Sequence, residues 1–110
     1  MPHDETLAYR IRELLNDQPS LREVKMFGGL AFMVDDRMVV CASAGGGALL
    51  VRVSPEDDPQ LLNRPGARRG EMGKGRTMGV GWIAVDAEAI ETNEDLEFWI
   101  HAALRHHATQ

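Results

Sequence analysis

The sequence is poor in cysteine, in aromatic residues and in long apolar runs. Its 110 residues include a single cysteine, Cys41, which excludes an intramolecular disulfide and a zinc site built from several cysteines. No run approaches the roughly 18 apolar residues of a membrane span, and residues 1–5 lack the basic and apolar regions of a signal peptide. We therefore expect a cytoplasmic protein that does not enter a membrane.

Acidic residues outnumber basic ones by 17 to 12, which gives a net charge of −5 with neutral histidines. This balance argues against a protein that binds nucleic acid with its whole surface. The length favours one domain over residues 1–110, large enough to bury a core without metal or disulfide cross-links.

The spacing of apolar residues predicts helices at both ends of the chain. Apolar residues from Leu7 to Leu15 recur on one face of a helix. Near the other end, Thr92 resembles the start of a capping box, and an apolar stripe follows over residues 96–104. A shorter helix is expected to begin at Ser54, because a serine side chain can accept the exposed amide hydrogens of a first turn.

Short β-rich runs lie between these helices. Asp35 and Asp36 separate two of the runs and predict a β-hairpin, because aspartate tolerates the positive φ of a tight turn. Residues 66–79 are rich in glycine and basic side chains and are expected to form a long mobile loop. The predicted strands cover residues 23–26, 30–34, 38–42, 48–53 and 80–85. The predicted fold is a two-layer α+β domain in the order α-β-β-β-β-α-β-α, with a mostly antiparallel sheet of about five strands and helices on one face.

The segment Met26-Phe27-Gly28-Gly29 joins the first two predicted strands. Its glycines can adopt positive φ and allow close backbone approach. One interpretation is a bend that faces a ligand or partner beside an anchoring phenylalanine. The other, which we favour, is a tight turn or bulge with Phe27 in the core.

This segment, the hairpin over residues 30–42, the run over 49–53 and the acidic-capped last helix together resemble the N-terminal domain of the TfoX/Sxy family. The resemblance covers nearly the whole chain. It implies a stand-alone domain with a two-layer fold similar to secretion-chaperone-like proteins. It also implies a regulatory association, since named members are linked to bacterial competence genes, and it implies no established active site.

The most basic stretch of the sequence is residues 64–76, with five basic residues and one acidic residue. One interpretation is that these side chains are simply solvated, and we favour it. The alternative is that they bind nucleic acid or phosphate. A nucleotide P-loop does not fit, because an arginine occupies the position that requires the first glycine and no Ser or Thr follows the lysine. The basic residues are Arg64, Arg68, Arg69, Lys74 and Arg76.

Two adjacent aromatic residues on the last predicted helix, Phe98 and Trp99, cannot both face one narrow apolar stripe. Either one of them is an exposed interface anchor, or a wide apolar face covers both.

The sequence offers no catalytic or metal-binding pattern. His101 and His106 are five residues apart, whereas two metal ligands on one helical face need a spacing of four. Cys41 has no base near it in the sequence and is expected to be a small buried hydrophobic residue. We therefore expect no cofactor and no metal, and a non-enzymatic regulatory or protein-interaction module. Its expected partner is a second copy of the chain or another protein, with nucleic acid as the alternative.

Overall fold

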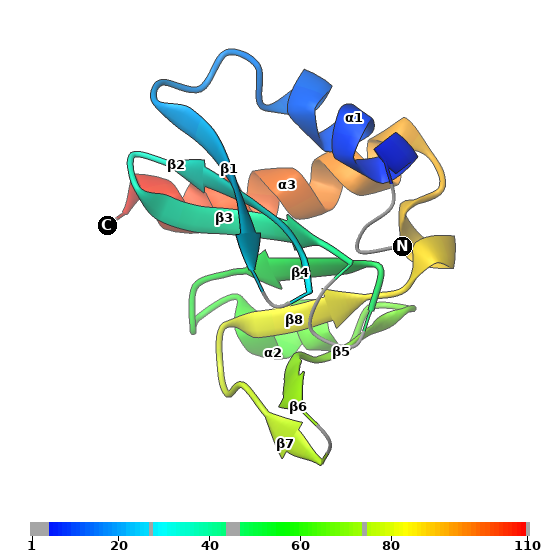
Figure 1. Cartoon of the computed structure of the whole chain (residues 1–110). Helices are drawn as coiled ribbons and strands as arrows, with labels where there is room; N and C mark the ends of the chain where they lie inside the picture. Colours follow the sequence, from blue (N-terminus) through cyan, green and yellow to red (C-terminus); the bar gives the residue numbers. More distant parts are fainter. Residues whose placement is uncertain (1–4, 27, 44–46, 74, 110) are drawn as a thin grey trace.

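A six-stranded sheet with three α-helices forms the body of the protein (Figure 1). The computed structural model describes residues 5–26, 28–43, 47–73 and 75–109. The helices are α1 (Glu5–Leu14), α2 (Asp58–Leu62), the 3-10 helix η1 (Ala87–Ile90) and α3 (Asn93–Ala108). The strands are β1 (Leu21–Met26), β2 (Gly29–Val34), β3 (Arg37–Ala42), β4 (Leu49–Arg52), β5 (Ala67–Arg69), β6 (Glu71–Gly73), β7 (Arg76–Thr77) and β8 (Trp82–Val85).

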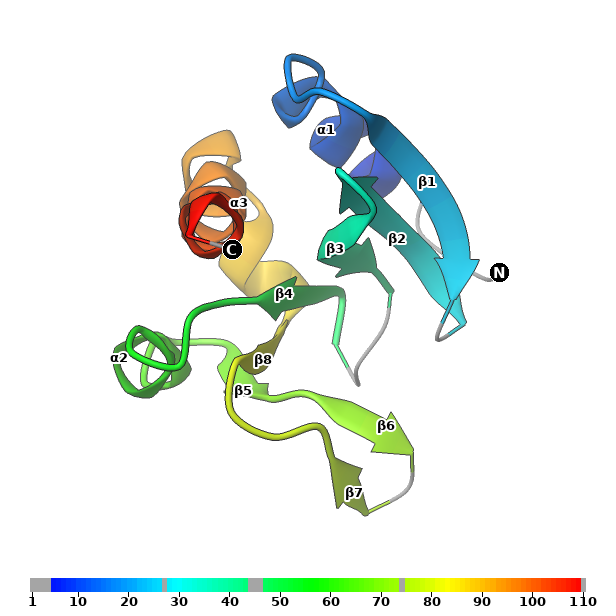
Figure 2. The same ribbon diagram turned by 90° about the vertical axis from the view of Figure 1, so that its left-hand side faces the viewer.

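The strand order is β1-β2-β3-β4-β8-β5, and every pairing in this sheet is antiparallel. Strands β6 and β7 form a separate two-stranded hairpin. In Figure 2, α1, α2 and α3 lie toward one side of the sheet and the β6–β7 hairpin extends toward the other. The predicted α+β class, the mainly antiparallel sheet and the helical layer are confirmed.

The main core lies between the sheet and the helices α1 and α3. The predicted helical stripes are confirmed, since Ile11, Leu15 and Ile100 are all buried in this core. The predicted cap of the last helix is also confirmed, because the Thr92 hydroxyl accepts a hydrogen bond from the Asp95 amide at 3.1 Å.

The β2–β3 connection is the predicted tight hairpin. Asp35 and Asp36 have φ of 52° and 65°, as a primed two-residue turn requires. The register shifts between Phe32 and Met33, because Val39 is an extra residue in β3. This bulge allows both Val39 and Val40 to be buried in the core.

The prediction that the short helix begins at Ser54 is wrong by four residues, because a turn precedes α2. The Ser54 hydroxyl does accept the Asp57 amide at 3.1 Å.

The prediction of a mobile loop over residues 66–79 is wrong. Residues Ala67–Arg69 form the sheet edge strand β5 beside β8, and β6 and β7 pair with each other. The physical reason is the partner of Arg69: its guanidinium binds the buried carboxylate of Asp58 and therefore lies at an inner position of the strand.

Candidate interaction surface

The face of the sheet opposite α1 and α3, called the outer face below, carries a second apolar cluster. Cross-strand partners point to the same side of a sheet, so the pairs Val24–Ala31, Ala31–Cys41 and Cys41–Leu50 trace one row across it. The row continues through the pairs Leu50–Ala84 and Ala84–Arg68 to the far edge of the sheet. All six strands therefore contribute to one continuous surface.

Larger apolar side chains cover the small residues at the centre of the outer face. Ala31, Cys41 and Leu50 are fully buried, although within the described part of the chain no helix packs on this side. Their cover consists of half-buried side chains: Met26, Met33, Met38, Met78 and Trp82. The surface is therefore a thin layer of flexible thioethers and one indole, which can adapt to an apolar partner.

The β6–β7 hairpin is joined to one side of this layer. A Cβ atom added to Gly70 would lie 2.9 Å from Leu50 Cδ1 and 3.2 Å from Met78 Sδ. The chain therefore passes close over the cluster at Gly70, where a larger residue would push these side-chain ends aside.

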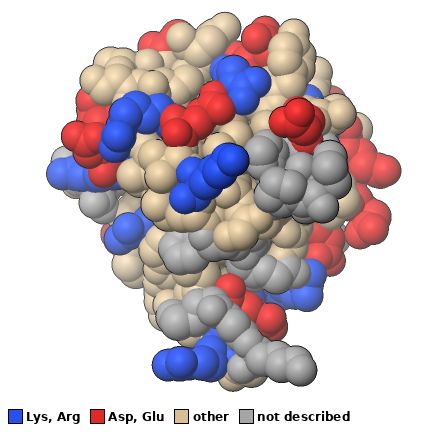
Figure 3. All heavy atoms as spheres, in the orientation of Figure 1, with Lys and Arg blue, Asp and Glu red and all other residues tan. Residues whose placement is uncertain are grey.

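The charged side chains that share these rows are arginines. Arg22 is the partner of Met33 in the register, and Arg52 is the partner of Trp82. Arg22 forms an ion pair with Asp36 at 2.8 Å, whereas the Arg52 guanidinium lies 5.0 Å from the Trp82 ring centroid in a cation–π contact. Figure 3 looks onto this face and shows other (tan) side chains between basic and acidic ones.

The sequence-predicted basic residues do not converge on one site. Arg69 Nη1 and Nη2 donate to the two Asp58 carboxylate oxygens at 2.6 and 2.8 Å. Arg68 forms an exposed ion pair with Asp86 at 2.6 Å, and Arg76 lies exposed on β7. Lys74 lies outside the described residues. The described members of the set are therefore divided among separate environments.

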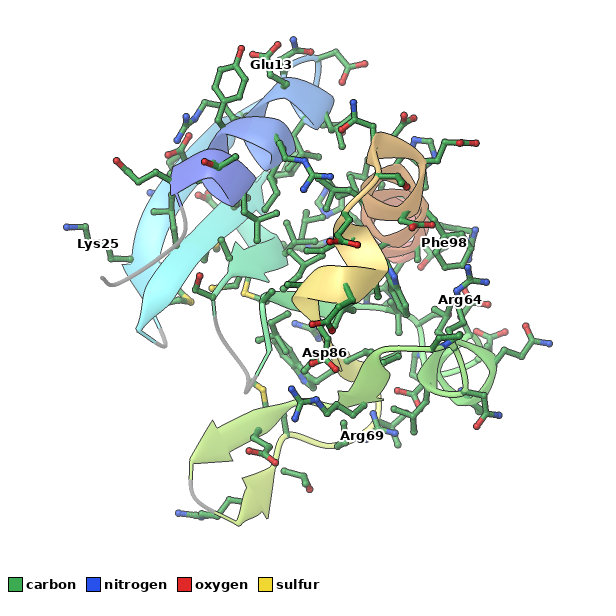
Figure 4. The ribbon with its side chains drawn as sticks, turned by 90° about the vertical axis from the view of Figure 1, so that its right-hand side faces the viewer. Glu13, Lys25, Arg64, Arg69, Asp86 and Phe98 are labelled. Carbon is green, nitrogen blue, oxygen red and sulfur yellow. The ribbon has the colours of Figure 1, made fainter. Side chains whose placement is uncertain are left out.

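Arg64 belongs to the aromatic pair of the last helix. Its guanidinium lies 3.8 Å from the Phe98 ring centroid, and the Phe98 and Trp99 rings meet edge to face at 5.4 Å. In Figure 4, Arg64 lies next to Phe98, while Arg69 lies apart from both. Trp99 is only 2% exposed and belongs to the core, so it cannot serve as a surface anchor. Phe98 is half-buried beneath the arginine.

The glycines of the Met26-Phe27-Gly28-Gly29 segment form the tight β1–β2 turn. Met26 pairs with Gly29 in the register, and Gly28 has a φ of +79°. A Cβ atom on Gly29 would lie 1.9 Å from the Ala42 carbonyl oxygen, so this position requires glycine. Phe27 lies outside the described residues.

Two of the side chains suited to chemistry, Cys41 and His107, are buried or paired. Burial raises the pKa of the Cys41 thiol to about 11, so it is protonated at neutral pH. His107 faces Asp35 at 3.6 Å. A search of the described residues finds no group of three or more metal-binding side chains, and it finds no helix long and apolar enough to cross a membrane.

Sequence reasoning missed the outer face, although one signal was present. Residues 30–34 form a continuous apolar run, which is typical of a strand covered on both faces. The helices account for only one of those faces.

The family model of the TfoX N-terminal domain matches residues 13–107 of the 110-residue chain. The match includes every strand of the sheet, α2 and most of α3. No curated protein and no solved structure is significantly similar to the chain.

Proposed function

The chain belongs to the TfoX N-terminal domain family, and we propose that it acts as a non-enzymatic interaction module whose outer face docks an apolar segment of another protein. The observation that carries this proposal is the methionine-rich layer on a sheet face that the helices leave open. Flexible methionine side chains are favoured at surfaces that bind varied apolar partners. The regulatory association implied by the family resemblance is consistent with such a module.

Between the two partners expected from the sequence, a second copy and another protein, the charge of the outer face favours another protein. The charged residues in the outer-face rows are Arg22, Arg52 and Arg68, and Arg52 faces an indole instead of a carboxylate. Arg22 and Arg68 already face carboxylates of the same chain. Two copies packed face to face would enclose two Arg52 side chains in one apolar interface and supply no further carboxylate from the described residues of the outer-face rows, which is unfavourable. A segment that carries carboxylates beside its apolar side chains complements this surface.

A synthetic peptide that alternates leucine and glutamate tests the proposal. A peptide of about ten residues reaches roughly 33 Å when extended, close to the 34 Å length of the domain. We expect it to shift the backbone amide resonances of Ala31, Cys41 and Leu50 in a heteronuclear NMR titration. A peptide that alternates leucine and lysine is expected to bind more weakly, because Arg52 repels it.

Met33→Lys places a charge in the layer and is expected to abolish the shifts. Tyr9→Lys is the matched control, because Tyr9 is 59% exposed on α1, away from the outer face. Absence of outer-face shifts with the leucine–glutamate peptide would refute docking at this face. A dimer in light scattering that Met33→Lys dissociates would show that a second copy occupies the face, and it would overturn the choice of partner.

A further inference from the structure

A basic hollow lies where the β2–β3 turn, the end of β4 and the end of α3 meet. It has room for one water-sized group, about 10 Å³. Four basic and two apolar side chains line it: Arg37, Arg52, His106, His107, Met38 and Ala103. The basic side chains come from three separate elements, so this cluster is a product of the fold and is not visible as a run of charges in the sequence.

Within the described part of the chain, the two arginines of the hollow lack acidic partners. Among the residues that the structure describes, neither the Arg37 nor the Arg52 guanidinium forms an ion pair with a carboxylate. Arg52 contacts the face of the Trp82 ring, which leaves its donor groups available at the ring edge. The other arginines of the sheet behave differently, since Arg22 and Arg68 each face a carboxylate.

Nearby acids neutralise the surroundings of the hollow only in part. Asp35 lies 3.6 Å from His107, and Asp57 accepts hydrogen bonds from Arg105 at 3.2 Å. Both carboxylates therefore face basic groups other than Arg37 and Arg52. The hollow keeps an excess of positive charge in a molecule whose net charge is −5.

We propose that this hollow binds an oxyanion, with one oxygen between the Arg37 and Arg52 guanidinium groups and the histidine rings beside it. A guanidinium presents paired N–H donors that match carboxylate, phosphate and sulfate oxygens. The small volume admits one oxygen while the rest of the anion stays outside. This site stands on its own lining residues and does not depend on docking at the outer face, although Met38 and Arg52 belong to both.

His106 is the internal reporter of the bound anion. Its pKa is lowered first by burial and then by the positive charges of Arg52 and His107, while Asp57 acts in the opposite direction. An anion in the hollow favours the charged ring, so the pKa of His106 rises on binding and binding weakens as the pH rises through the histidine range. The charged groups around this ring are Arg37, Arg52, Asp35, Asp57, Arg105 and His107.

Sulfate is the probe of choice because it stays dianionic between about pH 5 and 8, where histidine titrates. We expect saturable shifts of the His106 ring resonances when sulfate replaces chloride at constant ionic strength. Arg37→Gln and Arg52→Gln are each expected to weaken sulfate binding about tenfold, since each removes charge-assisted hydrogen bonds. Both side chains are exposed, so both variants should keep the circular dichroism spectrum of the native fold.

Arg76→Gln is the matched control, because Arg76 is an exposed arginine on the β6–β7 hairpin outside the hollow. It should leave the sulfate affinity unchanged. Equal affinity in all three variants, or equal shifts with chloride, would overturn the site. If sulfate and the leucine–glutamate peptide compete, the oxyanion that the hollow binds is a carboxylate of a docked partner. Sulfate binding unchanged by bound peptide would assign the site to a free oxyanion.

Discussion

Replacing Arg69 with methionine is expected to destabilise the fold severely by leaving a buried charge without its partner. The Asp58 side chain is 3% exposed and the Arg69 side chain 23%. The guanidinium also donates to the Gly79 carbonyl at 2.8 Å, and Asp58 accepts the Gly81 amide at 2.8 Å. Arg69→Met removes the cation and leaves the Asp58 carboxylate buried, with the Gly81 amide as its remaining donor.

Breaking a buried ion pair by removing one partner costs about 3–5 kcal/mol, and we expect about 3 kcal/mol here because Arg69 keeps some solvent contact. Arg68→Met is the matched control. Arg68 is the preceding residue, and its ion pair with Asp86 is exposed on both sides. An exposed pair contributes about 0–1 kcal/mol, so this control should differ little from the native chain.

The effect of pH gives an independent check on the same pair. The hydrogen bond from Arg69 is the main cause that lowers the pKa of Asp58, against desolvation. A lowered pKa stabilises the fold above the unfolded value of about 3.9, and that contribution is lost as the pH falls through the folded value. In Arg69→Met the cation is gone, so protonation of Asp58 relieves the buried charge. Burial without the cation raises the pKa of Asp58 in this variant. The difference in stability between the native chain and the variant should therefore begin to narrow above pH 4 and should narrow further as the pH falls below it.

Urea denaturation followed by circular dichroism measures these free energies of unfolding. Adding Asp58→Asn to Arg69→Met removes the unpaired charge and keeps an acceptor for Gly81, so the double variant should be about 1–2 kcal/mol more stable than Arg69→Met alone. The reasoning is refuted if Arg69→Met is as stable as Arg68→Met, or if the difference between native chain and Arg69→Met does not change between neutral and acidic pH.

Four further predictions concern the turns and the cysteine. Gly29→Ala places a Cβ atom 1.9 Å from the Ala42 carbonyl oxygen, so it should cost at least about 3 kcal/mol in urea denaturation. Gly28→Ala, with free space around its Cβ atom and a φ of +79°, should cost only about 1–2 kcal/mol. Asp36→Gly removes a side chain at a φ of 65° and should be neutral or stabilising by up to about 1 kcal/mol in thermal melts, since its ion pair is exposed. Cys41 should react with a thiol reagent at pH 8 only as fast as the protein opens, and rapid labelling of the folded protein would contradict its burial.

The helices α1 and α3 and the first four strands could be predicted because their signals are local. Ile11 and Leu15 recur at helical spacing, and Asp35 and Asp36 provide a turn with the required φ. These features depend on residues within a few positions of one another. The bulge at Val39 is an exception, since a one-residue shift is defined only by the neighbouring strand.

Strand β5 could not be predicted because its stability depends on distant residues. Read alone, Arg69 in a glycine-rich stretch indicates a solvated loop. Its carboxylate partner, Asp58, lies eleven residues earlier on a different element. A charge at an inner strand position becomes acceptable only when such a partner is present.

The candidate sites could be predicted only in part, because they also depend on residues that are distant in the sequence. Sequence spacing left two alternatives for Phe98 and Trp99. The fold buries Trp99 in the core and places Arg64 over the half-buried Phe98. The hollow that contains Arg37 and Arg52 joins residues from separate strands and from α3. No local pattern in the sequence reports that convergence.

The Arg69–Asp58 ion pair also helps to position the outer face, although neither residue belongs to that face. Arg69 binds the Gly79 carbonyl and, at 3.3 Å, the Trp82 carbonyl, so it holds the turn that leads into β8. Trp82 in turn supports Arg52. Loss of peptide binding in Arg69→Met would therefore reflect displacement of Trp82 together with loss of stability. Loss of binding in Arg52→Gln at unchanged stability would reflect recognition of charge, and this contrast separates the residue that positions the surface from the residue that contacts the ligand.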